Sequence, residues 1–263
     1  MQPVIPIGGY AGWRFLADTA EAQVAKMAES PIQARDRDYF RENIGKVTSA
    51  ADLVSDFRLR RVALAAYGLQ DDLPNKAFIE RILADGVADN AALSNRLSDK
   101  RYRAFSEAFG FGGPLPPRTI SPGFADRVLA RFDRIEFERA VGEQDEDMRL
   151  ALTVQRELPD LAARGFNDRT GWLSILGNPP LRKVFETAFG LPSSIGTLDL
   201  DRQVEDFRRA ATRVLGTSEV SQFRDPAATE ELIKAFTLRS QLASGPALTT
   251  PGLSALTLLR GGA

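Results

Sequence analysis

A run of alternating charges is the first place in this chain where residue types and spacing could support chemistry. The acids in residues 35–42 are Asp36, Asp38 and Glu42. Two neighbouring carboxylates can serve as a general acid and a general base. The arginines interleaved with them, Arg35, Arg37 and Arg41, favour another interpretation, in which the charges pair on a solvated helix face. We therefore predict a salt-bridged surface here and no catalytic pair.

A second acidic cluster could in principle bind a cation. It lies within residues 143–147 and consists of Glu143, Asp145, Glu146 and Asp147. Calcium and magnesium ions prefer oxygen ligands, but the spacing does not fit an EF-hand loop. Acids are also favoured at the start of a helix by the helix dipole. We expect the cluster to begin a helix and predict no metal site.

Two residue types on which much catalysis depends are missing from the sequence. It contains no histidine, the usual general base near neutral pH, and no cysteine, so thiolate nucleophiles and cysteine-based metal sites are excluded. No G-x-S-x-G motif is present to suggest a serine nucleophile. We therefore predict no catalytic, cofactor-binding or metal-binding residues.

The glycine-rich segment 110–117, with sequence GFGGPLPP, is interpreted as a loop. Its glycines, Gly110, Gly112 and Gly113, lack the GxxxxGK[ST] pattern of a phosphate-binding loop. Glycine and proline together interrupt regular structure, so this segment marks the strongest break between two parts of the chain.

The composition is that of a globular protein without a strong electrostatic preference. Of the 263 residues, 43% are hydrophobic and 26% are charged, with a net charge of −1. Arginine supplies most of the positive charge, and the arginines are interpreted as spread along the chain and matched by acids. No general attraction to nucleic acid or to an anionic membrane is expected. The apolar runs are also too short for a transmembrane helix, and residues 1–13 lack the basic start of a secretory signal.

Helical periodicity dominates the chain, and no segment shows the alternation of a strand, so we predict an all-α fold. Trp13 and Trp172 fall on apolar helix faces and are expected to anchor the core or an interface. Pro159 is expected to break or kink its helix. The predicted helices cover residues 12–29, 36–45, 50–67, 75–84, 90–97, 98–109, 121–141, a long segment after 147, a short one around 172–176, 180–189, 199–215 and 226–243.

The helix predicted for residues 50–67 has the clearest signals in the sequence. Ser49 followed by Asp52 resembles a capping box at its start, and Gly68 is suited to the left-handed conformation that ends a helix. Its predicted apolar face consists of Leu53, Phe57 and Leu64.

A weak internal repeat suggests two related helical units. A shift of 97 positions aligns Phe40 with Phe137 and Gly68 with Gly165. A shift of 80 positions aligns RYRAFSEAFGF with LRKVFETAFGL, although helices rich in Phe, Ala and Gly could match by coincidence. Repeated helical units commonly serve binding.

We accordingly predict the following organisation. Residues 12–111 form a first helical unit and residues 121–244 a second, whose helix pair at 199–242 could represent a partial third. Residues 1–11 and 245–263 are expected to be loosely ordered.

Several strings of this sequence resemble a bacterial family known only as a domain of unknown function. They are GWRFLADTAEAQ, RDRDYFRENIGKVTSAADLVSDFRLRRVALAAYGLQDD, NKAFIERILADG and LSDKRYRAFSEAFGF. The genes of this family often lie among flagellar genes. The resemblance implies a flagellum-associated protein, cytoplasmic or attached to the flagellum, and it supplies no catalytic residues.

The resulting functional hypothesis is a non-enzymatic interaction protein of the bacterial flagellum, acting as an assembly factor, a chaperone-like partner or a minor structural component. Its expected partner is a flagellar protein. The alternative is an enzyme or small-ligand binder that uses carboxylates and arginines in a cleft between the two units. A deep pocket with converging Asp, Glu and Arg side chains would favour this alternative.

Overall fold

Helices are the regular structure of the part of the chain that the structure describes. In a computed structural model, which describes residues 2–113 and 115–244, there are thirteen α-helices and five short 3₁₀ helices and no strand. The all-α prediction is therefore confirmed. None of the described helices is both long enough and apolar enough to cross a membrane.

The chain order of the α-helices follows the predicted pattern closely. The first half contains α1 (Gly9–Ala28), α2 (Pro31–Asn43), α3 (Ala50–Ser55), α4 (Phe57–Ala65), α5 (Lys76–Asp85), α6 (Leu93–Arg96) and α7 (Arg101–Phe109). The second half contains α8 (Phe124–Gly142), α9 (Glu146–Ala163), α10 (Asp168–Leu176), α11 (Pro179–Phe189), α12 (Leu200–Leu215) and α13 (Pro226–Ser244).

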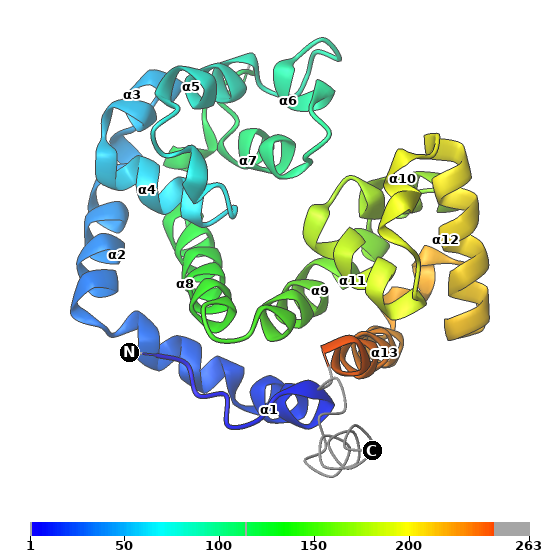
Figure 1. The fold of residues 1–263 in the computed structure, drawn as a ribbon. Coiled ribbons are helices and arrows are strands. Elements are labelled where there is room, and N and C mark those ends of the chain that lie inside the picture. Colours follow the sequence, from blue (N-terminus) through cyan, green and yellow to red (C-terminus); the bar gives the residue numbers. More distant parts are fainter. Residues whose placement is uncertain (1, 114, 245–263) are drawn as a thin grey trace, which may run out of the picture.

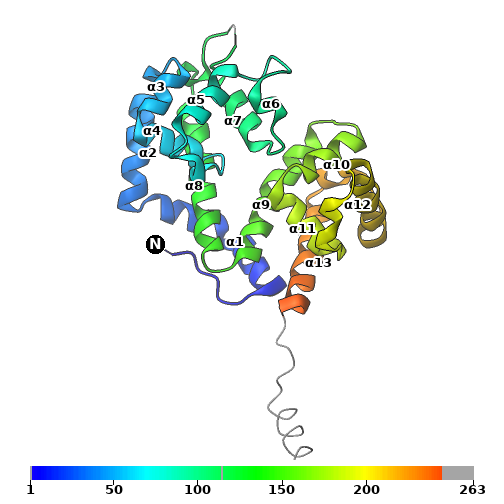
Figure 2. The same cartoon turned by 45° about the horizontal axis from the view of Figure 1, so that its top comes forward.

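The buried apolar side chains form two separate clusters, and these define two lobes (Figures 1 and 2). The N-terminal lobe contains α2 to α7 and the first half of α8. The C-terminal lobe contains α9 to α13, the second half of α8, and also α1. The cores therefore divide the chain differently from the predicted units 12–111 and 121–244. Helix α1 packs on the C-terminal lobe and not on the helices that follow it in sequence. Its Trp13 is fully buried in that lobe, and the indole nitrogen donates a hydrogen bond to Glu230 at 3.0 Å.

Helix α8 belongs to both cores and connects them. Phe132, in its middle, lies in the N-terminal cluster, whereas Phe137 lies in the C-terminal cluster. Five residues make less than two turns of helix, so the change of core happens within α8 and not at the glycine-rich loop 110–117.

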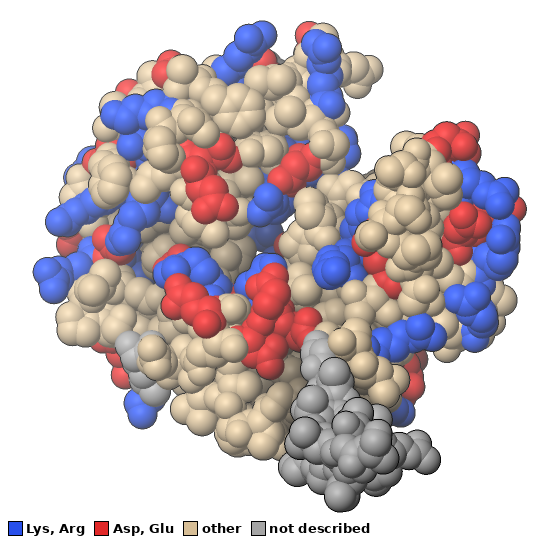
Figure 3. Space-filling model, in the orientation of Figure 1, with Lys and Arg blue, Asp and Glu red and all other residues tan. Residues whose placement is uncertain are grey.

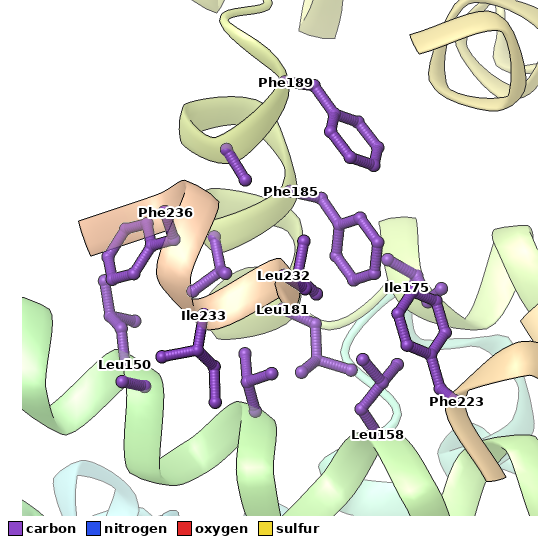
Figure 4. Close-up of a cluster of buried hydrophobic side chains, with 14 of the residues drawn as sticks. Leu150, Leu158, Ile175, Leu181, Phe185, Phe189, Phe223, Leu232, Ile233 and Phe236 are labelled. Atoms are coloured by element: carbon purple, nitrogen blue, oxygen red, sulfur yellow. The ribbon is translucent and has the colours of Figure 1, made fainter. Parts of the chain in front are cut away.

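The core of the C-terminal lobe is built mainly from α9, α11 and α13 (Figure 4). The figure shows Leu150 and Leu158 of α9 pointing towards the apolar side chains of α11 and α13. Trp172 packs edge-on against Phe185 with ring centroids 5.5 Å apart. The prediction that both tryptophans anchor the core or an interface is confirmed, since both are fully buried.

Several helix ends have the conformations expected from their residues. Ser49 and Asp52 form a capping box, in which each side chain accepts a backbone N–H of the other. Gly68, Gly110 and Gly190 all have a positive φ angle, which only glycine adopts without strain. The last two end α7 and α11, the helices that align at a shift of 80 positions. Their relation by duplication stays a prediction.

The prediction of one continuous helix over residues 50–67 is wrong, because two helices, α3 and α4, occupy this stretch. Asp56 has an extended backbone, and its carboxylate accepts the N–H groups of Arg58 and Leu59 at 2.9 Å, so it ends α3 and caps α4. The interruption rotates the following residues, and Phe57 is 56% exposed instead of buried. Leu53 and Leu64 are buried as predicted.

Three prolines lie where the observed helices differ from the predicted ones. Pro159 does not break its helix, since α9 continues through it to residue 163, with Leu158 and Ala162 buried on either side, and the kink stays a prediction. Pro31 starts α2 as its first residue, which moves the start of the helix from the predicted 36 to 31. Pro122 does not start α8, which begins two residues later at Phe124.

Residues 2–8 precede the first helix and are more ordered than predicted. The side chain of Gln23 bonds both the N–H and the carbonyl of Val4, at 2.7 and 3.3 Å. The carbonyl of Pro3 accepts a hydrogen bond from Gln144 at 3.0 Å. The predicted loose tail, 245–263, lies outside the described residues.

Candidate binding groove at the junction of the lobes

The face between the two lobes is hollowed and charged. Figure 3 shows side chains of both charges gathered in this hollow, over α8 and α9. A groove of about 430 Å³ lies here, lined by residues of α7, α8 and α9, by Tyr67 in the turn after α4 and by Arg118 in a 3₁₀ helix (Arg118–Ile120). We call it the arginine groove, and define it by Tyr67, Arg118, Arg127, Arg131, Arg134 and Arg156.

Three of these arginines form a row along α8. Arg127, Arg131 and Arg134 are separated by four and then three residues, a spacing that places side chains on one face of a helix. At 1.5 Å per residue the row is roughly 10 Å long. Two acids of the same helix pair away from the groove, because Asp126 bonds Arg41 of α2 at 3.2 Å and Asp133 pairs with Arg37, whereas Glu138 pairs with Arg156 of the groove.

Arg131 is fixed in the middle of the row. Its guanidinium carbon lies 4.6 Å from the centre of the Tyr67 ring, and its Nε donates to the carbonyl of Ala66 at 2.7 Å. Burial and the neighbouring charge of Arg156 lower the pKa of Arg131. The nearest carboxylate, on Glu157, is 4.0 Å away. The positive charge of Arg131 is therefore oriented but only weakly compensated.

Arg156 holds the carboxylates at the junction. It donates to both oxygens of Glu138, at 2.7 and 2.9 Å, and to Glu157 at 2.8 Å. Burial acts to lower the pKa of Arg156, but the bonds and charges of these two glutamates outweigh it and raise the pKa. Thr153 and Asn178 donate further hydrogen bonds to the same two glutamates. Both glutamates thus accept several hydrogen bonds at the junction.

The other three arginines of the groove have guanidinium N–H groups that form no hydrogen bond with the described residues. Arg127 is exposed and donates only to the carbonyl of Pro122, at 3.2 Å. Arg118 and Arg134 are also exposed, and neither forms an ion pair or side-chain hydrogen bond with any residue in the described ranges. The stem of Arg118 lies against Gly110, where an added Cβ would be 3.3 Å from it.

The groove can bind anions but offers little for proton transfer. Arginine remains charged at any physiological pH. The pKa of Tyr67, which is ordinarily far above neutrality, is raised further by burial. Among the described lining residues, none therefore changes its protonation near neutral pH. What the groove supplies is a set of fixed hydrogen-bond donors and positive charges.

The first acidic cluster is only partly the solvated face predicted from the sequence. Asp38 is exposed and lies 3.8 Å from Arg41, as expected of a surface pair. Asp36 is buried, with 7% of its surface exposed, and pairs with Arg61 of α4. The interpretation was wrong for Asp36 because the packing of α2 on α4 cannot be read from α2 alone.

The second acidic cluster begins α9, as predicted. The carboxylate of Asp145 caps the helix and accepts the N–H groups of Asp147 and Met148 at 3.0 and 3.1 Å. Glu143 pairs with Arg139 at 2.7 Å, Glu146 pairs with Arg149, and Asp147 accepts a hydrogen bond from Ser240. In the described part of the chain, no group of three potential ligands is placed to hold a metal ion.

The glycine-rich segment 110–117 serves as a loop in contact with another loop. A Cβ on Gly112 would lie 2.3 Å from the backbone nitrogen of Gly86, so the two glycines permit a close backbone approach. Within this segment Gly110 lies against the stem of Arg118, which lines the arginine groove.

One part of the groove could have been predicted from the sequence, but the balanced numbers of acids and arginines led to another interpretation. The spacing of Arg127, Arg131 and Arg134 is visible in the sequence, but the arginines were interpreted as matched by acids. For Arg127 and Arg134 that interpretation is wrong, because the acids of α8 pair with other arginines, namely Arg41, Arg37, Arg139 and Arg156. The contributions of Tyr67, Arg118 and Arg156 depend on tertiary packing and leave no local pattern.

Comparison with known proteins places the chain in a family. Residues 66–229 match the family described as "Protein of unknown function (DUF1217)". The chain belongs to this family. The resemblance to a domain of unknown function is thereby confirmed.

A solved structure has the same fold. It is the crystal structure of protein AGR_C_984 from Agrobacterium tumefaciens, which is 26% identical and superposes with a TM-score of 0.76. The match covers 94% of the present chain and 100% of the other. No curated protein matches the sequence.

Proposed function

We propose that the protein is a non-enzymatic interaction protein that binds a protein partner of the bacterial flagellar system. The arginine groove carries the binding part of this proposal, because it presents several oriented cations with unused donors. The flagellar part is supported by the resemblance of RDRDYFRENIGKVTSAADLVSDF and the strings that follow it to a family encoded among flagellar genes. The protein would act in the cytoplasm or attached to the flagellum.

The chemistry of the groove favours binding over catalysis. A general acid or base works best when its pKa lies near the operating pH. The two glutamates at the junction are held by Arg156, with bonds of 2.7 to 2.9 Å. The bonds between Glu138 and Arg156 join α8 to α9, so they give this carboxylate a structural role in the contact between the two helices.

An enzyme or small-ligand binder remains the second candidate, and one observation favours it. The groove has a volume of about 430 Å³, within the range of small-molecule pockets, and both carboxylates and arginines converge beside it. In that case a small anion would bind alone, without a protein partner.

Affinity purification from flagellated cells tests the proposal. Tagged protein should recover flagellar components, and a deletion strain should have impaired flagella or motility. Recovery without any flagellar component, together with normal motility of the deletion strain, would contradict the flagellar function. The culture medium should be analysed in parallel, because a flagellum-associated protein can leave the cell through the flagellar apparatus.

A further inference from the structure

We propose that the arginine groove is the docking site for an acidic polypeptide segment whose carboxylates follow one another along a line. The identity of the protein that carries this segment rests on the function proposed above. The docking itself depends only on the geometry and charge of the groove.

The shape of the cation row selects a linear anion. Arg127, Arg131 and Arg134 extend over roughly 10 Å of α8, with Arg118 and Arg156 also lining the groove. An acidic helix with carboxylates at the same spacing would present a complementary row. In an extended peptide, three residues cover about the same length. A single compact anion could contact only part of the row.

The row is also partly organised before any ligand binds. Arg131 is held by the Tyr67 ring and by the carbonyl of Ala66. The fixed orientation reduces the side-chain entropy lost on binding. Arginine further forms paired hydrogen bonds with carboxylates, which lysine cannot do.

A small residue keeps the row accessible. Ala130 is exposed and lies between Arg127 and Arg134 in the lining of the groove. Its methyl group leaves space above the helix where a bound segment can approach. Filling this space would obstruct docking without altering any charge.

Peptide is favoured over nucleic acid for two reasons. The net charge of −1 gives no overall attraction to a polyphosphate. Sequence-tolerant binding of single strands relies on aromatic rings that stack with bases. The Tyr67 ring in this groove is already stacked with Arg131.

The test measures fluorescence anisotropy of a labelled alanine-rich helical peptide with glutamates at positions i, i+4 and i+7. A matched peptide with glutamines is the reference. Full-length protein should bind the glutamate peptide and not the glutamine peptide. Binding should weaken as salt rises from about 50 to about 300 mM, because exposed charges are screened.

Two variants with the same charge change separate the groove from general electrostatics. Arg127→Glu with Arg134→Glu should weaken binding about tenfold or more, since two rim cations become repulsive. The control is Arg103→Glu with Lys183→Glu, on α7 and α11. Both control residues are exposed and form no ion pair within the described chain, and this change should alter the affinity less than about twofold.

A third variant tests the position without changing charge. Ala130→Trp should also weaken binding, and circular dichroism should show the same helix content as the unmodified protein. Equal effects of the groove and control variants, or full binding by Ala130→Trp, would overturn the proposal. Tighter binding of oligothymidylate or tripolyphosphate than of the peptide would overturn it as well.

The result separates this proposal from the flagellar function. If the peptide binds in the groove but no flagellar protein is recovered from cells, the docking site stands and the function fails. If a flagellar protein is recovered equally by the groove variant and the control, the function stands and the docking site fails.

Discussion

Arg156 organises the polar contacts at the junction of the lobes. It binds two glutamates at once, while Arg131, its neighbour in the groove, contacts an aromatic ring and a backbone carbonyl, and its nearest carboxylate is 4.0 Å away. This division leaves positive charge on the groove side and paired charge behind it. Binding and stability therefore depend on different arginines of one cluster.

Removing Glu138 should destabilise the protein strongly. Its side chain is 6% exposed, and Glu138→Ala would leave the buried Arg156 with Glu157 alone. We expect a loss of about 3 kcal/mol in the free energy of unfolding, measured with urea at neutral pH. The control Glu143→Ala removes a 64% exposed carboxylate and should cost less than about 1 kcal/mol. Similar losses for both would show that the buried pair is not a stabilising unit.

Asp56 should make the free energy of unfolding depend on pH in the acidic range. Burial acts to raise the pKa of Asp56, but hydrogen bonds from the backbone of Leu59, from Tyr39 and from Arg58 outweigh it, so the pKa is lowered. A lowered pKa in the folded state adds stability above the unfolded pKa of about 4. This stability is lost as the pH falls through the folded value.

The variant Asp56→Ala should therefore cost roughly 1 to 2 kcal/mol at pH 7, as expected for loss of a helix cap. The difference from the unmodified protein should narrow below about pH 4. The measurement is urea unfolding at a series of pH values. Asp38→Ala, at an exposed and weakly paired site, serves as the control. A difference that stays constant down to about pH 3 would contradict the role of the carboxylate.

At the scale of single residues, the sequence predicted burial better than pairing. Trp13, Trp172, Leu53 and Leu64 are buried as their helical spacing indicated. Asp36 and the α8 arginines were misjudged, because the partner of a charged side chain is set by which helices lie next to each other.

At the scale of elements, local signals located most helices and failed where two signals competed. Residues 50–67 have a continuous apolar pattern, yet Asp56 is a better helix cap than a helix interior residue, and capping prevailed. Pro159 shows the opposite outcome, because tertiary packing overrides the local preference of proline. Helix α8 contributes buried residues to both lobes, and its own sequence gives no indication of where one core ends and the other begins.

Substitutions in the two halves of α8 should each destabilise a different lobe. Phe132→Ala and Phe137→Ala each remove a large buried side chain and should cost about 3 to 5 kcal/mol. Hydrogen exchange monitored by mass spectrometry should show faster exchange in α4 for the first variant and in α9 for the second. Equal acceleration of both lobes by either variant would show that the two clusters act as one cooperative core.

At the scale of the whole molecule, two lobes flank a charged hollow and meet on more than one side. They share α8, and they also approach where a Cβ on Gly177 would lie 3.1 Å from the carbonyl of Ser98. The predicted division into residues 12–111 and 121–244 missed this arrangement, since α1 joins the later helices. The groove arises where α7, α8 and α9 meet the segments that carry Tyr67 and Arg118, and could be anticipated only through its α8 row.

Site-specific cross-linking in living flagellated cells tests the central claim most directly. A photoreactive amino acid replaces Ala130 in the groove or, as a control, Lys183 on α11. The groove position should cross-link to an acidic segment of a flagellar protein, identified by mass spectrometry, and the control position should not. Cross-links that map only to non-flagellar proteins or to segments without acidic residues, or equal cross-linking from Lys183, would contradict the account.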